Sequence, residues 1–196
     1  MTRDEAIAEV YKHCDLQQRL ASLPPSAKVR GVFFRSIDRV LGQAGLLPRF
    51  ELLFPNRPSS VPWYPFSEFL TQVAVGGAML AGAEQVQHGM YEIGRRNAIA
   101  VAESLFGRAL LRLLSPNPRN LLMQGMAARR QGFNVGTWEL TFPSDRSAVM
   151  TMKEEYLYMD SYLLGAAYGT FETINVPVKV ECVLDDPYNG RHFLSW

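Results

Sequence analysis

Residues 84–142 read EQVQHGMYEIGRRNAIAVAESLFGRALLRLLSPNPRNLLMQGMAARRQGFNVGTWELTF, and this stretch decides how the rest of the chain is organised. Its first part predicts one long helix from about Glu84 to Leu114, which a turn with two prolines brings to an end. A shorter helix from Arg119 to Gln131 and a strand from Asn134 to Phe142 follow. The patterning therefore changes from helical to β-type within this stretch.

Three polar residues interrupt the apolar face of the long helix. On an ideal helix of about 3.6 residues per turn, Asn97, Ser104 and Arg108 fall within the apolar stripe. Because an unpaired neutral polar group costs roughly 1–3 kcal/mol when it is buried, these side chains need partners, and they predict the polar floor of a cavity. Alternatively, the helix bends at Gly107 and Arg108 extends to water. The stripe itself consists of Val86, Met90, Ile93, Val101 and Leu105.

The remaining patterns predict an α+β fold. Before the long helix, helical patterns occupy Asp4–Cys14, Asp15–Leu23, Ala27–Leu41 and Phe66–Gly82, and four prolines make residues 54–65 an extended segment. After residue 142, strands at Val149–Leu157, Val178–Leu184 and His192–Trp196 surround a helix at Met159–Ile174. We expect an N-terminal helical bundle packed on one face of a small antiparallel sheet, with a strand-strand-helix-strand-strand ending.

Length and composition favour one globular domain. The 196 residues are 47% hydrophobic and 20% charged, which is typical of a chain with a packed core. We expect a single domain over residues 1–196, with a helical extension at 1–25 and the core at 26–196. The formal net charge of +1 gives no bulk electrostatic reason to expect nucleic acid or an anionic membrane as a partner.

The cellular compartment is predicted from the cysteines and the apolar segments. Cys14 and Cys182 lie near opposite ends of the chain, so the sequence predicts neither a disulfide framework nor a zinc site. The N-terminal residues are charged and lack the apolar core of a signal peptide. The most apolar run, residues 66–83, has Ser67, Glu68, Thr71 and Gln72 at its start, and the roughly ten apolar or small residues that follow are too few to span a bilayer. We therefore expect a cytoplasmic protein without membrane insertion.

Catalytic motifs are missing from the sequence. It contains no Gly-x-Ser-x-Gly, phosphate-binding loop, Gly-x-Gly-x-x-Gly or His-x-x-x-His pattern. The adjacent acids Glu154-Glu155 and Asp185-Asp186 would point to opposite faces of a strand and so make no two-carboxylate site. We predict no enzymatic activity, no catalytic residue and no metal site.

Several blocks of the chain together resemble a known family. These blocks are KVRGVFFRSIDRVLG at 28–42, WYPFSEFL at 63–70, GMYEIGRRNAIAVAESLFGRALLRLL at 89–114, RRQGFNVGTWEL at 129–140 and LSW at 194–196. They resemble a paralogous family of myxobacterial proteins that is catalogued as a domain of unknown function. The resemblance extends from about Asp15 to Trp196, and it implies no particular activity.

More remotely, the strand-strand-helix-strand-strand ending after helices resembles a superfamily that includes heme nitric-oxide-binding domains, four-vinyl-reductase domains and TRAPP vesicle-tethering subunits. This likeness implies an α+β fold that often dimerises and often encloses an apolar cavity. A heme sensor of this group needs a buried axial histidine and a Tyr-x-Ser-x-Arg motif. Here the motif region reads FNVGT at 133–137, and the histidines are His13, His88 on the charged helix face, and His192. No heme or other cofactor is therefore predicted.

Two non-enzymatic functions follow from these observations. In the first, the chain is a sensor or adaptor of bacterial signalling that binds a small hydrophobic ligand in an apolar cavity. In the second, it is a homodimeric interaction or scaffold module, joined through helices rich in small residues. The same lining residues would then be ordinary core. The predicted ligand-binding residues are Met79, Met90, Ile93, Asn97, Val101, Ser104, Arg108 and Trp138.

Overall fold

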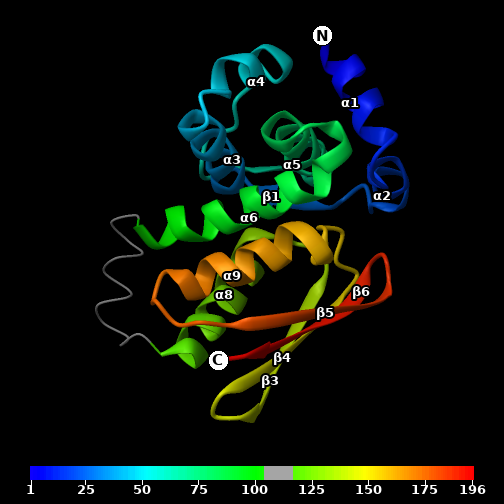
Figure 1. Cartoon of the computed structure of the whole chain (residues 1–196). Helices are drawn as coiled ribbons and strands as arrows, with labels where there is room; N and C mark the ends of the chain where they lie inside the picture. Colours follow the sequence, from blue (N-terminus) through cyan, green and yellow to red (C-terminus); the bar gives the residue numbers. More distant parts are fainter. Residues whose placement is uncertain (104–116) are drawn as a thin grey trace. The chain divides into compact units, whose positions relative to one another are not determined.

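The computed structural model describes residues 1–103 and 117–196, apart from the side chains of residues 101–103. The chain forms two compact units, Met1–Ile93 and Gly94–Trp196, so the division falls within helix α6 (Val86–Glu103). Figure 1 labels most of the elements of both units.

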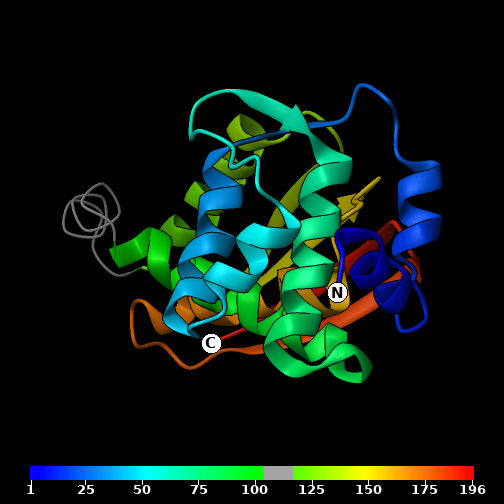
Figure 2. The same ribbon diagram turned by 90° about the horizontal axis from the view of Figure 1, so that it is seen from above.

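The first unit is built around helix α5. Figure 2 shows α5 between α3 and the pair α1 and α2, and α5 packs against all three. Ten of its residues are buried, as expected for a helix with neighbours around it. These residues are Phe66 and 69–77. The elements are α1 (Arg3–Tyr11), α2 (Leu16–Ser22), α3 (Val32–Gln43), α4 (Leu47–Leu53), α5 (Phe66–Ala81) and the 3₁₀ turn η1 (Ala83–Gln85), followed by the start of α6.

Glycines allow α5 and α6 to cross at backbone contact. A Cβ atom on Gly89 would lie 2.0 Å from the carbonyl oxygen of Gly77, and one on Gly77 would lie 2.9 Å from the Cγ atom of Met90. Real Cβ atoms do not approach other atoms so closely, so both positions require glycine. The two helices are therefore packed closely at Gly77 and Gly89.

A short ribbon of two strands replaces the start of a predicted helix. The sequence predicts a helix from about Ala27 to Leu41, but residues 28–30 form β1 (Lys28–Arg30), which pairs antiparallel with β2 (Trp63–Pro65). Arg30 donates to the carbonyl oxygen of Val61 at 2.7 Å, and its guanidinium carbon lies 4.5 Å from the centre of a Trp63 ring. These contacts between distant segments override the local helical pattern. Helix α4 was also not predicted.

The second unit contains a four-stranded antiparallel sheet in the order β3-β4-β6-β5. Its strands are β3 (Thr137–Ser144), β4 (Ser147–Lys153), β5 (Lys179–Asp186) and β6 (Asn189–Ser195), which form two hairpins joined by the pairing of β4 with β6. In β5, Val180 is buried, whereas Leu184, near the end of the strand, is 41% exposed. The predicted α+β fold class is confirmed.

Helices α8 (Pro118–Gly132) and α9 (Leu164–Glu172) complete the second unit. The sequence predicts one helix over Met159–Ile174, but its first turn is a π-helix, η2 (Met159–Leu163). The second half of α6 packs tightly on η2 and α9. A Cβ atom on Gly94 would lie 1.9 Å from the carbonyl oxygen of Tyr162, and one on Gly169 would lie 2.1 Å from that of Arg95. These two glycines therefore permit the close crossing.

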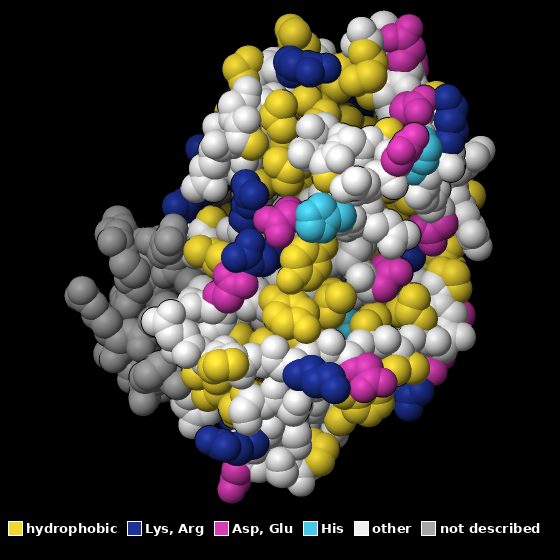
Figure 3. All heavy atoms as spheres, in the orientation of Figure 1, with side chains coloured by type: hydrophobic (Ala, Val, Ile, Leu, Met, Phe, Trp, Pro, Cys, Tyr) yellow, Lys and Arg dark blue, Asp and Glu magenta, His cyan; other side chains and the backbone are white. Residues whose placement is uncertain are grey.

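Charged side chains of both signs are spread over the face of the molecule shown in Figure 3, with hydrophobic and neutral side chains between them. This mixture agrees with the formal net charge of +1. Within the described part of the chain, no helix is both long enough and apolar enough to cross a membrane.

Candidate ligand-binding site

Three of the predicted ligand-binding residues lie in the first unit. Met90 and Ile93 are fully buried, and both fill the contact between α5 and α6. Met79, on α5, is half-buried and lines a pocket of about 260 Å³. The structure therefore makes two of these residues part of the helical core and places the third at an opening.

The pocket beside Met79 lies among α1, α4 and α5. Its walls are mostly small or apolar, and Glu9 and Arg49 add charge. Hydrogen bonds from Lys12 and then from His13 hold the pKa of Glu9 below its ordinary value. The lining residues are Met1, Ala6, Glu9, Val10, Arg49, Val75, Ala78, Met79 and Ala83.

Asn97 makes a buried hydrogen bond in the second unit. This residue of α6 is 7% exposed, and its Nδ2 atom donates to the Tyr162 hydroxyl at 2.9 Å. Burial raises the pKa of Tyr162 to about 12, although the hydrogen bond from Asn97 opposes this rise, so the side chain is a neutral phenol. The amide oxygen Oδ1 of Asn97 is buried and has no hydrogen-bond partner in the described protein. The amide nitrogen of Asn97 therefore has a hydrogen-bond partner, whereas its amide oxygen has none among the described residues.

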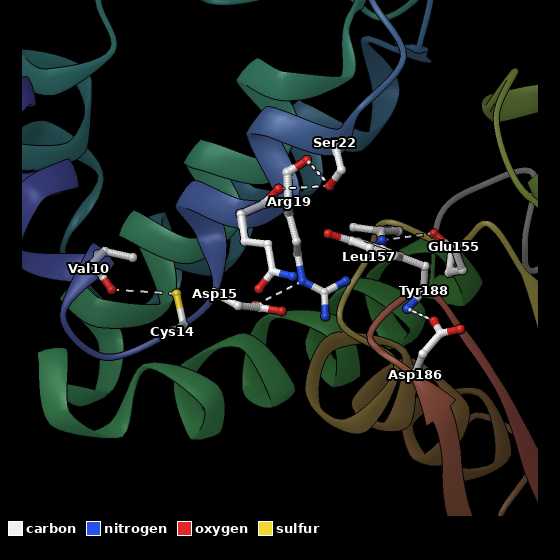
Figure 4. Close-up of polar contacts among 10 residues, drawn as sticks. Val10, Cys14, Asp15, Arg19, Ser22, Glu155, Leu157, Asp186 and Tyr188 are labelled. Atoms are coloured by element: carbon white, nitrogen blue, oxygen red, sulfur yellow. Dashed lines mark hydrogen bonds and ion pairs between the residues drawn. The ribbon is translucent and has the colours of Figure 1, made fainter.

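Trp138 belongs to a different polar cluster, which is centred on the carboxylate of Glu155. Glu155 is fully buried, and its Oε2 atom accepts from Trp138 Nε1 at 2.6 Å and from Arg129 Nη2 at 2.8 Å. The other oxygen, Oε1, accepts from the Leu157 amide at 2.9 Å (Figure 4). Arg129 also donates to the Val135 carbonyl at 2.7 Å. Both oxygens of this buried carboxylate have partners.

The backbone around this cluster is shaped to fit it. Gly136 has a φ of +74°, and a Cβ atom there would lie 2.8 Å from the Glu154 carbonyl oxygen and 3.1 Å from Arg129 Nη2. The Arg129 guanidinium carbon also lies 4.1 Å from the centre of the Phe133 ring. The segment FNVGT at 133–137, where a Tyr-x-Ser-x-Arg motif would fall, therefore encloses Arg129.

Three of the eight predicted ligand-binding side chains fall outside the part of the chain that the structure describes. Ser104 and Arg108 lie outside the described residues, and so does the side chain of Val101. Asn97 and Trp138 share the second unit but contact different partners, Tyr162 and Glu155. The predicted set is thus divided among local environments, and its role in ligand binding stays a prediction.

Sequence reasoning missed Arg129, Glu155 and Tyr162. The Arg129 side chain is 7% exposed and is paired with Glu155. Arg129 and Glu155 are 26 residues apart, so no local spacing connects them. Tyr162 lies within the helix predicted over Met159–Ile174, where no local pattern marks it as a partner of Asn97. A polar group in an apolar stripe was a useful signal only for Asn97.

The three histidines are in different environments. His192 is 1% exposed, and its Nε2 atom lies 2.8 Å from the Met159 carbonyl oxygen, to which it donates. Burial lowers the pKa of His192, so the ring is neutral. His88 is exposed, as the sequence predicts, and stacks on Tyr91, whereas His13 contacts Glu9 at 3.4 Å. Among the described residues, no group of three or more His, Cys, Asp or Glu residues is arranged to hold a metal ion.

Comparison with known proteins gives a family and a fold. Residues 23–196 match a family described as "Protein of unknown function (DUF2378)". No curated protein matches the chain.

Solved structures with a similar fold are H-NOX proteins. A mutant of the Fe(II) unliganded H-NOX protein from K. algicida has a TM-score of 0.65 at 15% identity, covering 85% of this chain and 95% of that chain. A double mutant of Tt H-NOX has a TM-score of 0.64 at 14% identity, covering 85% and 94%. At such identities the likeness shows the fold alone.

Proposed function

This chain belongs to the DUF2378 family, and we propose that it is a non-enzymatic sensor or adaptor domain that binds a small ligand other than heme. The α+β fold shared with H-NOX proteins supports a sensor. The proposal also includes what the sequence resemblance implies. These points are a role in bacterial signalling, membership of a myxobacterial family and kinship with TRAPP-like proteins.

Two of the solved structures with a similar fold are described in terms of their heme, but the described residues of this chain do not fit that group. An axial histidine needs a buried ring with a nitrogen directed at the iron. His88 is exposed, and His13 contacts Glu9. His192 is buried, but its Nε2 atom is bonded to the Met159 carbonyl, which leaves only Nδ1 for a metal. The region where a Tyr-x-Ser-x-Arg motif would fall reads FNVGT at 133–137 and supplies none of its three residues. The proposed ligand is therefore not heme.

The observation that carries the proposal is the unpaired amide oxygen of Asn97. This oxygen is buried, and leaving such an acceptor unpaired costs roughly 1–3 kcal/mol. A ligand with a hydroxyl or N–H group would remove this cost by donating to it. The Tyr162 hydroxyl already holds the other end of the amide, so the oxygen is fixed in direction. We therefore assign to Asn97 the orientation of a polar group on an otherwise apolar ligand.

Native mass spectrometry of freshly purified protein, beside its denatured mass, tests this function. We expect excess mass that disappears on denaturation, and about tenfold weaker retention of that ligand in Asn97→Ala, since a lost hydrogen bond of about 1.4 kcal/mol corresponds to that factor. The matched control is Asn56→Ala, which changes an exposed asparagine. Circular dichroism would verify that both variants are folded.

Two results would count against the proposal. One is a wild-type mass equal to the bare chain, and the other is equal retention by Asn97→Ala and Asn56→Ala. A bare mass at twice the chain would favour the homodimeric scaffold instead. The glycines of α5 and α6 do not support that alternative, because Gly77 and Gly89 are already used in the crossing of these two helices.

A further inference from the structure

The pocket beside Met79 is formed jointly by an N-terminal helix and the helical core of the first unit. Residues 1–22, which include α1 and α2, precede the range that matches the family. Helix α1 contributes Ala6 and Val10 to the pocket, and α5 contributes Ala78 and Met79 from the opposite side. One wall of this pocket is therefore formed by residues outside the matched range.

Helix α1 is firmly attached to the core. Val10 is 1% exposed, and Ala6 is also buried. The Arg3 guanidinium lies 2.5 Å from the Glu68 carboxylate of α5, and its carbon lies 5.0 Å from the centre of the Phe54 ring. The opening between α1 and α5 is consequently a formed pocket with fixed walls.

The size and walls of the pocket restrict its ligand. Its volume of about 260 Å³ is slightly below the range of roughly 300–1,000 Å³ that is usual for drug-sized ligands. Three of the lining residues are alanines, Ala6, Ala78 and Ala83, whose short side chains leave this space. A slender alkyl chain fits such a site better than a fused ring system does.

The charges at the pocket favour an anionic group. Arg49, on α4, has no hydrogen-bond or ion-pair partner within the described residues. The acid of the pocket, Glu9, is already paired with Lys12 at 2.6 Å and with His13 at 3.4 Å. The unpaired charge is thus positive, and a guanidinium can bind a carboxylate through two parallel hydrogen bonds.

We propose that this pocket binds a medium-chain alkyl carboxylate. Its carboxylate is held by Arg49, and its chain lies between α1 and α5 against Ala78 and Met79. The site lies in the first unit and is independent of the site proposed at Asn97. Because α1 forms one wall, an occupied pocket links the N-terminal helix to the family domain.

Calorimetric titration of the full chain with decanoate, below its micelle-forming concentration, tests this inference. We expect saturable binding to the wild type and about tenfold weaker binding to Arg49→Gln, since a change of 1.4 kcal/mol in binding energy corresponds to that factor. Arg130→Gln, which changes an exposed arginine of α8, should bind like the wild type. Ala78→Phe should abolish binding because its ring fills the pocket.

The head group and the place of binding are tested separately. Decanol has the same chain without the charge, and it should bind at least tenfold more weakly than decanoate. Absence of decanoate binding to the wild type would overturn the proposal, as would equal binding by Arg49→Gln and the wild type. Asn97→Ala should leave decanoate binding unchanged, so failure of this site and failure of the site at Asn97 give different results.

Discussion

Two buried polar clusters of the second unit differ in how completely their atoms are bonded. In the cluster around Glu155, both carboxylate oxygens accept hydrogen bonds, from Arg129, Trp138 and the Leu157 amide. In the pair of Asn97 and Tyr162, the amide nitrogen is bonded, whereas the amide oxygen has no partner among the residues that the structure describes. The Glu155 cluster is fully explained by a structural role, because both of its carboxylate oxygens have hydrogen-bond partners. The amide oxygen of Asn97 has room for a further donor, and for this reason we assign ligand binding to Asn97 and not to Glu155.

The largest expected effect comes from breaking the complete cluster. Glu155→Gln keeps the shape of the side chain but leaves the Arg129 charge buried without its counter-ion. Removing one partner of a buried pair usually costs about 3–5 kcal/mol, so we expect a loss of that order in the free energy of unfolding. Urea denaturation followed by circular dichroism measures it.

The control for this experiment is an exposed ion pair of the same unit. Arg119 and Asp145 lie 2.9 Å apart, and the Asp145 side chain is 96% exposed. Asp145→Asn should therefore leave stability almost unchanged. If Glu155→Gln and Asp145→Asn had similar effects, the Glu155 cluster would not be the structural centre that we describe.

The incomplete pair should respond less strongly and in a non-additive way. Tyr162→Phe removes the acceptor of the Asn97 nitrogen and leaves a fully unsatisfied amide, which should cost about 1–3 kcal/mol. Asn97→Leu combined with Tyr162→Phe replaces both partners with apolar groups. The double variant should therefore be more stable than the sum of the two single changes predicts. A double-mutant cycle of thermal unfolding checks this, and strict additivity would mean that the hydrogen bond contributes nothing.

The smallest expected effect is a pH dependence at a third buried polar group, His192. Burial lowers its pKa below the ordinary value of 6.5, although the Met159 carbonyl and the nearby Asp160 oppose the shift. Since the unfolded state then binds the proton more readily, stability is full above about pH 6.5 and falls as the pH drops below it. The slope from this residue cannot exceed about 1.4 kcal/mol per pH unit.

Substitutions of two histidines separate this contribution from the others. His192→Gln keeps a donor for the Met159 carbonyl and should reduce the loss of stability between pH 7.5 and 5.5, measured by urea denaturation. The exposed His88→Gln should leave the loss as it is in the wild type. An unchanged pH profile in His192→Gln would contradict the assignment.

Long periodic segments made most of the fold predictable. The predicted helix at Phe66–Gly82 corresponds to α5 (Phe66–Ala81), and the helix at Arg119–Gln131 corresponds to α8 (Pro118–Gly132). Strand β1 was not predictable in this way, because it depends on pairing with residues far along the chain. The π-helical start at Met159 was missed for a similar reason, since no local periodicity distinguishes it from an α-helix.

The candidate site was predictable only where a residue conflicted with its own local pattern. Asn97 was identified because a polar residue in an apolar helical stripe needs a partner, and the structure supplies one in Tyr162. Trp138 was predicted as a ligand-binding residue, but its bond to Glu155 depends on the register of the pairing between β3 and β4 and on the path of the chain after β4, which the sequence does not display. Pairings of this kind arise from tertiary structure, so a single sequence does not reveal them.

The order of strands in the sheet has a consequence for the rate of folding. Hairpins β3–β4 and β5–β6 each close a short turn, and hairpins of this kind form within about 1–10 microseconds. The central pairing of β4 with β6 must instead enclose residues 154–188, at a higher cost in chain entropy. We therefore expect the two hairpins to form early and their union to limit the rate. The contact of the Trp196 amide with the Arg146 carbonyl, 3.0 Å, then forms with that last step.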